Sequence, residues 1–233
     1  MPVLDLIDFG RRMYERDLLV AMDGNVSARR PDGTYLCSRA GTHKGFLEPS
    51  DFVAVDSDGK KLSGEGEPTT EIFLHLAAYQ ERPDVGAVLH AHPPHAIACT
   101  LAGISLEDPI LAEVILTLGT VPVVPYATTG SKALAEACRP HFRLRDAILL
   151  ERHGAVALGR TPLEAFCRLE TLEHLARILL LAHSVRAPTL IPRQEAIHLR
   201  KLGLGRYGGP PEAVAMRDRE DADLPLPHDD GKR

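Results

Sequence analysis

Residues 86–92, Gly-Ala-Val-Leu-His-Ala-His, form the segment that most constrains how this chain folds. Apart from its two histidines the segment is apolar, and Pro93-Pro94 ends it, so the pattern predicts a short buried strand. Just before it, apolar side chains recur at helical spacing over residues 72–79, and Thr69 or Thr70 is the predicted N-cap of that helix. A helix followed at once by a buried strand favours a mixed α/β fold.

Similar patterns predict the other elements. Segments 24–29 and 34–37 flank the turn Pro31-Asp32-Gly33 and predict a β-hairpin. The best-marked helix begins at Thr161, the expected N-cap, with Pro162 at its first position and Glu164 closing a capping box. We expect further strands at residues 52–55, 121–124, 147–150 and 155–158, and further helices from residue 1 to about 20, 95–101 and 131–140.

Composition and charge exclude several classes of function. With 233 residues the chain has room for one large domain or two small ones, and its formal net charge of −5 argues against nucleic acid as the main partner. The most apolar stretch, residues 163–183, is interrupted by charged side chains, so we expect no membrane span. The four cysteines are scattered and no charged-then-apolar leader opens the sequence, which predicts reduced thiols in the cytoplasm.

The character of the chain changes after Tyr207. The run Gly208-Gly209-Pro210-Pro211 is followed by many charged residues and few large apolar ones. Such a composition does not support a packed core. We therefore expect one folded domain over residues 1–207 and a mobile charged tail over residues 208–233.

Histidines are the most distinctive candidates for chemistry. His90 and His92 are two apart on the predicted strand, where side chains alternate, so both imidazoles point to the same face. His153 follows another predicted strand, and three histidines with an open position suit a catalytic zinc. Hydrogen-bonded core histidines fit the same spacing, so the residues alone leave both interpretations open.

Glu71 is the second candidate, in the first turn of the helix that follows Thr69 and Thr70. In one interpretation its carboxylate complements the helix dipole and the threonines cap the helix. In the other, the exposed N–H groups and hydroxyls bind a phosphate beside Glu71 as acid/base. Asn25 lies in a Gly-Asn turn, where a structural role is the default. The Gly-bracketed loop 38–45 either binds an anion or is a surface turn.

Taken in order, these segments resemble the class II aldolase/adducin family over about residues 3–207. No one motif is decisive, but their order and spacing together are specific. The matching motifs are Gly24-Asn25-Val26-Ser27, Pro68-Thr69-Thr70-Glu71, Leu74-His75-Leu76-Ala77-Ala78-Tyr79, Ala87-Val88-Leu89-His90-Ala91-His92, Pro125-Tyr126-Ala127-Thr128-Thr129-Gly130, His153-Gly154 and Leu172-Glu173-His174-Leu175-Ala176.

The resemblance implies a three-layer α/β/α fold with a mainly antiparallel central sheet, and it makes residues 1–207 the catalytic domain. It implies a Zn²⁺ ion, or another divalent metal, held by His90, His92 and His153, and a homotetramer with sites between subunits. Glu71 matches the catalytic acid/base, and Tyr207 is placed like a tyrosine that closes over a neighbouring site. The substrate phosphate is assigned to Asn25, Ala40, Gly41, Thr69 and Thr70, of which Ala40 stands where the family usually has a hydroxyl.

The activity implied is reversible cleavage of a ketose 1-phosphate, such as L-fuculose 1-phosphate, to dihydroxyacetone phosphate and an aldehyde. A metal-stabilised enediolate would form, and Glu71 would move the proton on its carbon. A second tyrosine of the family aldolase, which exchanges a proton with the leaving oxygen in this reversible reaction, has no counterpart here, and Glu113 lies near its position.

Other functions on the same scaffold stay open. Loop 40–45 followed by residues 49–52 is also similar to the family's methylthioribulose-1-phosphate dehydratases, which keep a glutamate at the position of Glu71. Another sugar-phosphate lyase or epimerase also stays open, but the family's ribulose-5-phosphate 4-epimerase is disfavoured, because it carries an aspartate there. A non-catalytic, adducin-like module predicts an eroded metal site, whereas all three histidines and Glu71 are present. The other eight histidines keep structural roles, with His95 nearest the expected pocket: His43, His75, His95, His141, His174, His183, His198 and His228.

Overall fold

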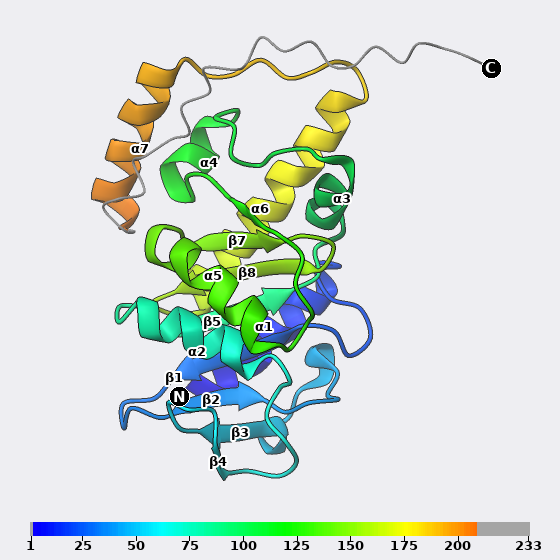
Figure 1. Ribbon diagram of the computed structural model, residues 1–233, viewed down its shortest axis with the longest axis vertical. Coiled ribbons are helices and arrows are strands. Elements are labelled where there is room, and N and C mark those ends of the chain that lie inside the picture. Colours follow the sequence, from blue (N-terminus) through cyan, green and yellow to red (C-terminus); the bar gives the residue numbers. More distant parts are fainter. Residues whose placement is uncertain (1, 209–233) are drawn as a thin grey trace, which may run out of the picture.

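One eight-stranded sheet forms the centre of the molecule (Figure 1). The computed structural model describes residues 2–208. Along the sheet the strand order is β4-β3-β2-β1-β5-β8-β7-β6; every neighbouring pair is antiparallel except β6 and β7, which are parallel. The strands are β1 (Asn25–Arg29), β2 (Tyr35–Ser38), β3 (Phe52–Val55), β4 (Lys61–Ser63), β5 (Ala87–Ala91), β6 (Val123–Val124), β7 (Ala147–Leu150) and β8 (Gly154–Gly159).

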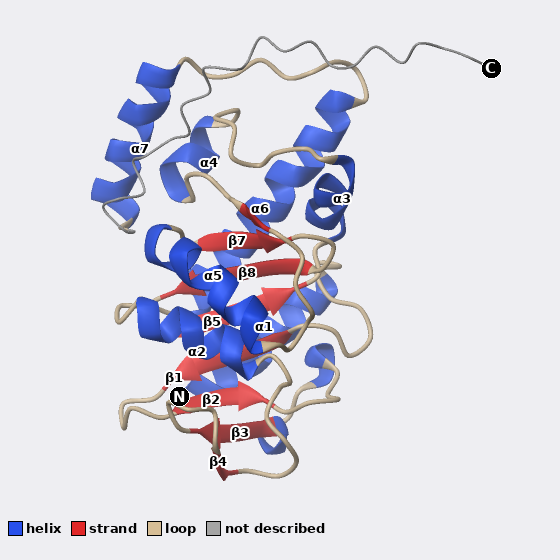
Figure 2. Cartoon of the chain, viewed as in Figure 1, coloured by secondary structure: helices blue, strands red, loops and turns tan. Residues whose placement is uncertain are grey.

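Helices cover both faces of the sheet, so the fold is the expected three-layer α/β/α arrangement (Figure 2). One apolar core joins the sheet to α1 and α6, and a second joins its other face to α2 and α5. The helices are α1 (Pro2–Glu15), α2 (Ile72–Glu81), α3 (Pro94–Ala102), α4 (Ala112–Thr117), α5 (Lys132–Leu144), α6 (Pro162–His183) and α7 (Arg193–Tyr207), with short 3₁₀ turns η1 (Lys44–Phe46) and η2 (Pro49–Asp51).

Helix α7 packs mainly against α4, at the end of the sheet where β6 and β7 lie (Figure 1). The sequence patterns did not predict either of these helices. Among residues 2–208, no helix combines the length and the apolar character that crossing a membrane requires. Residues 209–233, most of the expected tail, lie outside the described part of the chain.

The structure corrects two predicted boundaries and one predicted capping contact. Helix α1 ends at Glu15 rather than near residue 20, because Asp17 adopts a left-handed conformation (φ 58°) and its neighbours close a Schellman motif, with Leu18 N–H donating to Met13 O at 2.9 Å. Strand β6 has only two residues, since Pro122 cannot donate to a ladder. Thr161 does cap α6, but Glu164 accepts from Arg160 N–H and not from Thr161 N–H.

Candidate metal and substrate site

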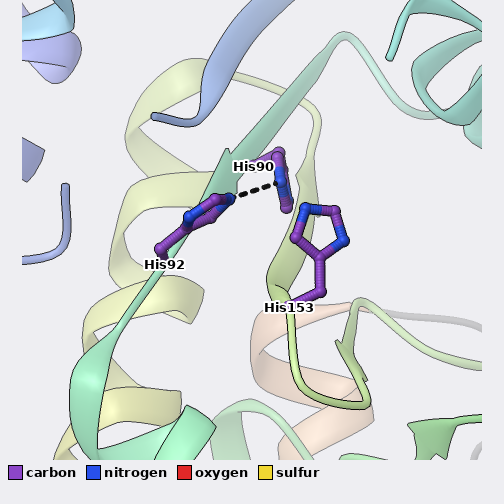
Figure 3. Close-up of side chains that lie close together, drawn as sticks. All are labelled: His90, His92 and His153. Carbon is purple, nitrogen blue, oxygen red and sulfur yellow. Dashed lines mark hydrogen bonds between the residues drawn. The ribbon is translucent and has the colours of Figure 1, made fainter. Parts of the chain in front are cut away.

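Three histidines meet at the C-terminal end of strand β5. His90 is buried on β5, His92 follows its last residue, and His153 stands in the tight turn between β7 and β8. Antiparallel pairing sets Ala91 opposite Ala155, which brings that turn to the end of β5. The ring centroids form a nearly equilateral triangle with sides of 4.8–5.0 Å (Figure 3). One ligand nitrogen from each histidine lies within 4.8 Å of the others.

Hydrogen bonds to the far sides of the rings set the tautomers. His90 Nδ1 lies 2.9 Å from Ala155 O, an atom that only accepts, so Nδ1 carries the proton. His92 Nδ1 likewise faces the Asp23 carboxylate at 3.2 Å. In the neutral rings the Nε2 lone pairs therefore face inward, and these two Nε2 atoms lie only 3.1 Å apart (Figure 3). Such outer contacts are typical of metal-ligating histidines.

Glu71 completes this cluster. Its Oε2 lies 3.1 Å from His90 Nε2, and its Oε1 lies 3.4 Å from His153 Nε2. Two bare imidazole nitrogens and a carboxylate repel one another unless a proton or a metal cation lies among them. The donor set therefore fits a divalent metal that prefers imidazole nitrogen, with Glu71 beside it.

Burial and neighbouring charges tune these groups. Burial, followed by repulsion from His90, lowers the pKa of both His92 and His153 to about 4, so both rings are neutral near pH 7. Burial alone would raise the pKa of the Glu71 carboxyl, but attraction to His90 and the Asn25 amide outweigh it and hold that pKa below its usual range. Neutral imidazoles are the form that binds metal.

The start of α2 differs from its prediction in a way that explains Glu71. Neither threonine caps the helix: Glu71 itself occupies the N-cap position without a side-chain cap bond, and its N–H donates to Thr69 Oγ1 at 3.3 Å. Its carboxylate is thereby free to turn toward the histidines. Asn25, opposite His90 in the β1–β5 register, donates from Nδ2 to Glu71 Oε2 at 2.9 Å.

One cavity of about 300 Å³ connects these residues to the expected phosphate side. Gly41 has a φ of 73°, and a Cβ added there meets nothing within 4 Å, so the loop keeps its backbone open to the cavity. The predicted residues that line the cavity are Asn25, Ala40, Gly41, Thr69, Thr70, Glu71, His92 and His153; those not predicted are Met22, Asp23, Gly24, Arg39, Lys44 and Thr129.

Lys44 is the most unusual of the unpredicted lining residues. Its side chain is buried, and Nζ donates to Met22 O and Thr42 O, each at 2.6 Å, so it ties the two loops of the cavity wall together. Burial lowers the pKa of the Lys44 ammonium to about 8. The basic character of loop 38–45 was the signal in the sequence that could have identified it.

Three residues considered for the site lie elsewhere. Tyr207, 43% exposed at the end of α7, lines a separate groove beside α6 and is absent from this chain's own cavity. His95 is hydrogen-bonded to Glu173 and lines another pocket. Glu113 lies on α4 and does not line the cavity either, and no tyrosine does among residues 2–208.

Comparison with known proteins agrees with this geometry. Residues 4–180 match the model of the class II aldolase and adducin N-terminal domain. An L-fuculose phosphate aldolase of Methanocaldococcus jannaschii is 36% identical over 182 residues, 78% of this chain and 97% of that protein. A 3-oxo-tetronate 4-phosphate decarboxylase of Escherichia coli is 33% identical over 170 residues, 71% and 80% of the two chains. The crystal structure of L-fuculose-1-phosphate aldolase from Thermus thermophilus superposes with a TM-score of 0.70 at 29% identity, covering 80% of this chain and 97% of that one.

Proposed function

The chain belongs to the class II aldolase and adducin family, and on this premise we propose that it is a zinc-dependent aldolase acting on a ketose 1-phosphate such as L-fuculose 1-phosphate. The observation that carries the proposal is the cluster of His90, His92, His153 and Glu71. All of these except the fully buried His90 line one cavity together with the expected phosphate-binding residues. A non-catalytic module is expected to have lost some of these donors, whereas this chain contains all four.

The residues divide the work between two ends of the cavity. Thr69 and Thr70 offer hydroxyls and Gly41 offers a backbone N–H for the phosphate, as at other anion sites near a helix start. The N–H of Ala40, which was also expected to bind it, already donates to Glu67 O at 2.9 Å. The three histidines would hold the metal, which when bound polarises the ketone oxygen as a Lewis acid. Cleavage leaves the electron pair of the C3–C4 bond on C3, and Glu71 would pass to C3 one proton, which balances the proton that the C4 hydroxyl releases.

A neighbouring chain is part of the proposal. The C4 hydroxyl of the substrate must lose a proton when the aldehyde forms, and the cavity contains no tyrosine among the described residues to accept it. Tyr207 stands exposed at the end of α7, away from its own cavity. We place Tyr207 over the cavity of an adjacent subunit in a homotetramer.

We also propose that the protein is cytoplasmic, because all four cysteines are free thiols.

Decarboxylation of a phosphorylated 3-oxo acid is the second candidate. It leaves the same electron pair beside the ketone but releases CO₂, so no hydroxyl proton has to be accepted. The lack of a tyrosine among the described residues of the cavity and the similarity to a relative named as a decarboxylase both favour it. Methylthioribulose-1-phosphate dehydration stays a third possibility, since it also uses a glutamate.

A substrate comparison tests these assignments. Zinc-loaded protein is incubated separately with L-fuculose 1-phosphate, 3-oxo-tetronate 4-phosphate and methylthioribulose 1-phosphate, and dihydroxyacetone phosphate, CO₂ and water-loss product are measured. We expect dihydroxyacetone phosphate from the first. Release of CO₂ from the second alone would assign a decarboxylase, and loss of water from the third alone a dehydratase; either result overturns the aldolase proposal.

A further inference from the structure

A buried chain of hydrogen bonds runs from the core to Glu71. Tyr79 OH lies 2.8 Å from Ser27 Oγ, and Ser27 Oγ lies 2.6 Å from His75 Nδ1. His75 Nε2 bonds to Asn25 Oδ1, and Asn25 Nδ2 bonds to Glu71 Oε2 at 2.9 Å. His75 and Ser27 are fully buried, and Tyr79 and Asn25 are nearly so.

Two periodicities create this alignment. Glu71, His75 and Tyr79 are spaced by four, which sets them along one side of α2 and its N-cap. Asn25 and Ser27 are spaced by two on β1, so both point to the same face of the sheet. The two rows face each other, and their side chains alternate along the series of hydrogen bonds, so that each β1 side chain bonds to two side chains of the α2 row.

This series of hydrogen bonds has one direction. Because the Glu71 carboxylate only accepts, the amide nitrogen of Asn25 faces it and the amide oxygen faces His75. That oxygen also only accepts, so the proton of His75 is on Nε2 and its Nδ1 is bare, which agrees with burial lowering the pKa of His75 to about 3. Ser27 then donates to His75, and Tyr79 donates to Ser27. Every donor points toward Glu71.

We propose that His75 is a positioning residue for catalysis, which fixes the Asn25 amide and through it the Glu71 carboxylate. Reversal of the amide would set its oxygen against the carboxylate, and the Nε2–H of His75 prevents this reversal. Of the two carboxylate oxygens, Oε2 is held by Asn25, whereas buried Oε1 has no hydrogen-bond partner among the described residues. The geometry therefore assigns proton transfer to Oε1. This inference rests on the proposed function of Glu71.

Substitutions along the chain test the role. His75→Leu removes both hydrogen bonds, and we expect kcat to fall roughly 10–100-fold, as for other residues that orient catalytic groups, with KM changed less than about threefold and metal content unchanged. His75→Gln retains an amide donor and an acceptor and should recover most of kcat. Tyr79→Phe removes only the outermost donor and should lower kcat by a smaller factor in the same direction.

Tyr35→Phe is the matched control. Tyr35 stacks on Tyr79 with ring centroids 4.8 Å apart and is also buried. Its hydroxyl, however, accepts from Arg29 and is not part of the hydrogen-bond series that leads to Glu71. We expect its kcat to equal that of the native protein. A purely structural role of His75 would lower the melting temperature and active fraction without rescue by Gln. That outcome, or an unchanged kcat in both His75→Leu and Tyr79→Phe, overturns the proposal.

A second measurement does not depend on turnover. In protein labelled with ¹⁵N-histidine, the ring nitrogens of His75 should show the neutral Nε2–H tautomer across neutral pH. The Nδ1–H tautomer would contradict the direction of the chain, and with it the proposal. If the native protein cleaves none of the phosphorylated substrates while His75 shows the Nε2–H tautomer, the proposed function fails and the hydrogen-bond assignment stands.

Discussion

At the scale of single residues, the same side chain serves a local pattern and a distant site. Glu71 occupies the N-cap of α2, where a carboxylate would ordinarily stabilise the helix, yet its side chain makes no cap bond and turns to His90 and Asn25. The position at the helix start was predictable from sequence. The direction of the side chain depends on its contacts with Asn25 on β1 and His90 on β5. These strands come next to Glu71 only when the chain folds.

Glu71→Gln tests its role as acid/base. The amide keeps the size of the side chain but does not carry a transferable proton at this position, so we expect kcat to fall roughly 10²–10⁴-fold with zinc content retained. Steady-state kinetics and metal analysis measure both. Glu67→Gln is the control, because the Glu67 side chain is 81% exposed and does not line the cavity. Native kcat in Glu71→Gln would remove Glu71 from the mechanism.

At the scale of elements, the start of β8 is shaped for the histidines. A Cβ on Gly154 would lie 2.4 Å from Ala91 O, 2.9 Å from His92 Cδ2 and 3.1 Å from His90 Cε1. The backbone of β8 approaches β5 too closely there for any side chain. Glycine at position 154 is therefore required for the three imidazoles to lie this close together, in addition to any role in the turn.

Gly154→Ala should disturb the site more than the fold. The added methyl group has to displace His90 and His92, which we expect to weaken zinc binding roughly tenfold or more and to cost about 1–3 kcal/mol of stability from overpacking. Zinc titration and urea unfolding measure the two effects. Gly205→Ala on α7, where a Cβ meets nothing within 4 Å, should change neither. Unaltered zinc affinity in Gly154→Ala would show that the backbone yields without moving the imidazoles.

At the scale of the whole molecule, the candidate metal site joins parts that are distant in sequence. It brings together the end of β5 and the β7–β8 turn, and Glu71 adds the start of α2 from the layer above the sheet. Because the unfolded chain does not hold these groups together, a metal that binds here should stabilise the folded state.

Metal removal should therefore destabilise the protein. Free zinc at about 1,000 times its dissociation constant should add about 4 kcal/mol to the free energy of unfolding relative to chelated protein. Denaturant unfolding with zinc and with a chelator measures the difference. In His153→Ala this difference should largely disappear, whereas in His174→Ala, an exposed position outside the site, it should persist. An equal zinc response in His153→Ala would exclude His153 as a ligand.

The amino-acid sequence by itself determined the elements whose signals are local. The apolar run at β5 with its two alternating histidines, the hairpin of β1 and β2, and the Thr161 cap of α6 all follow from patterns within a few residues. The end of α1 escaped prediction, because Asp17 adopts a conformation that normally marks a glycine. The short helix α4 and the exposed α7 carried too little periodic signal to be predicted.

Only the tertiary structure decided which of the local candidates meet. The pairing of β5 with β8 selects His153 from the other histidines and brings it to His90 and His92. Packing of α2 against β1 makes His75, a core histidine by its sequence alone, part of a directed path to Glu71. These relations depend on strand register and on the facing of two periodic rows, and neither is encoded within one segment of the chain. The eleven histidines thus acquire different chemistry from their neighbours in space.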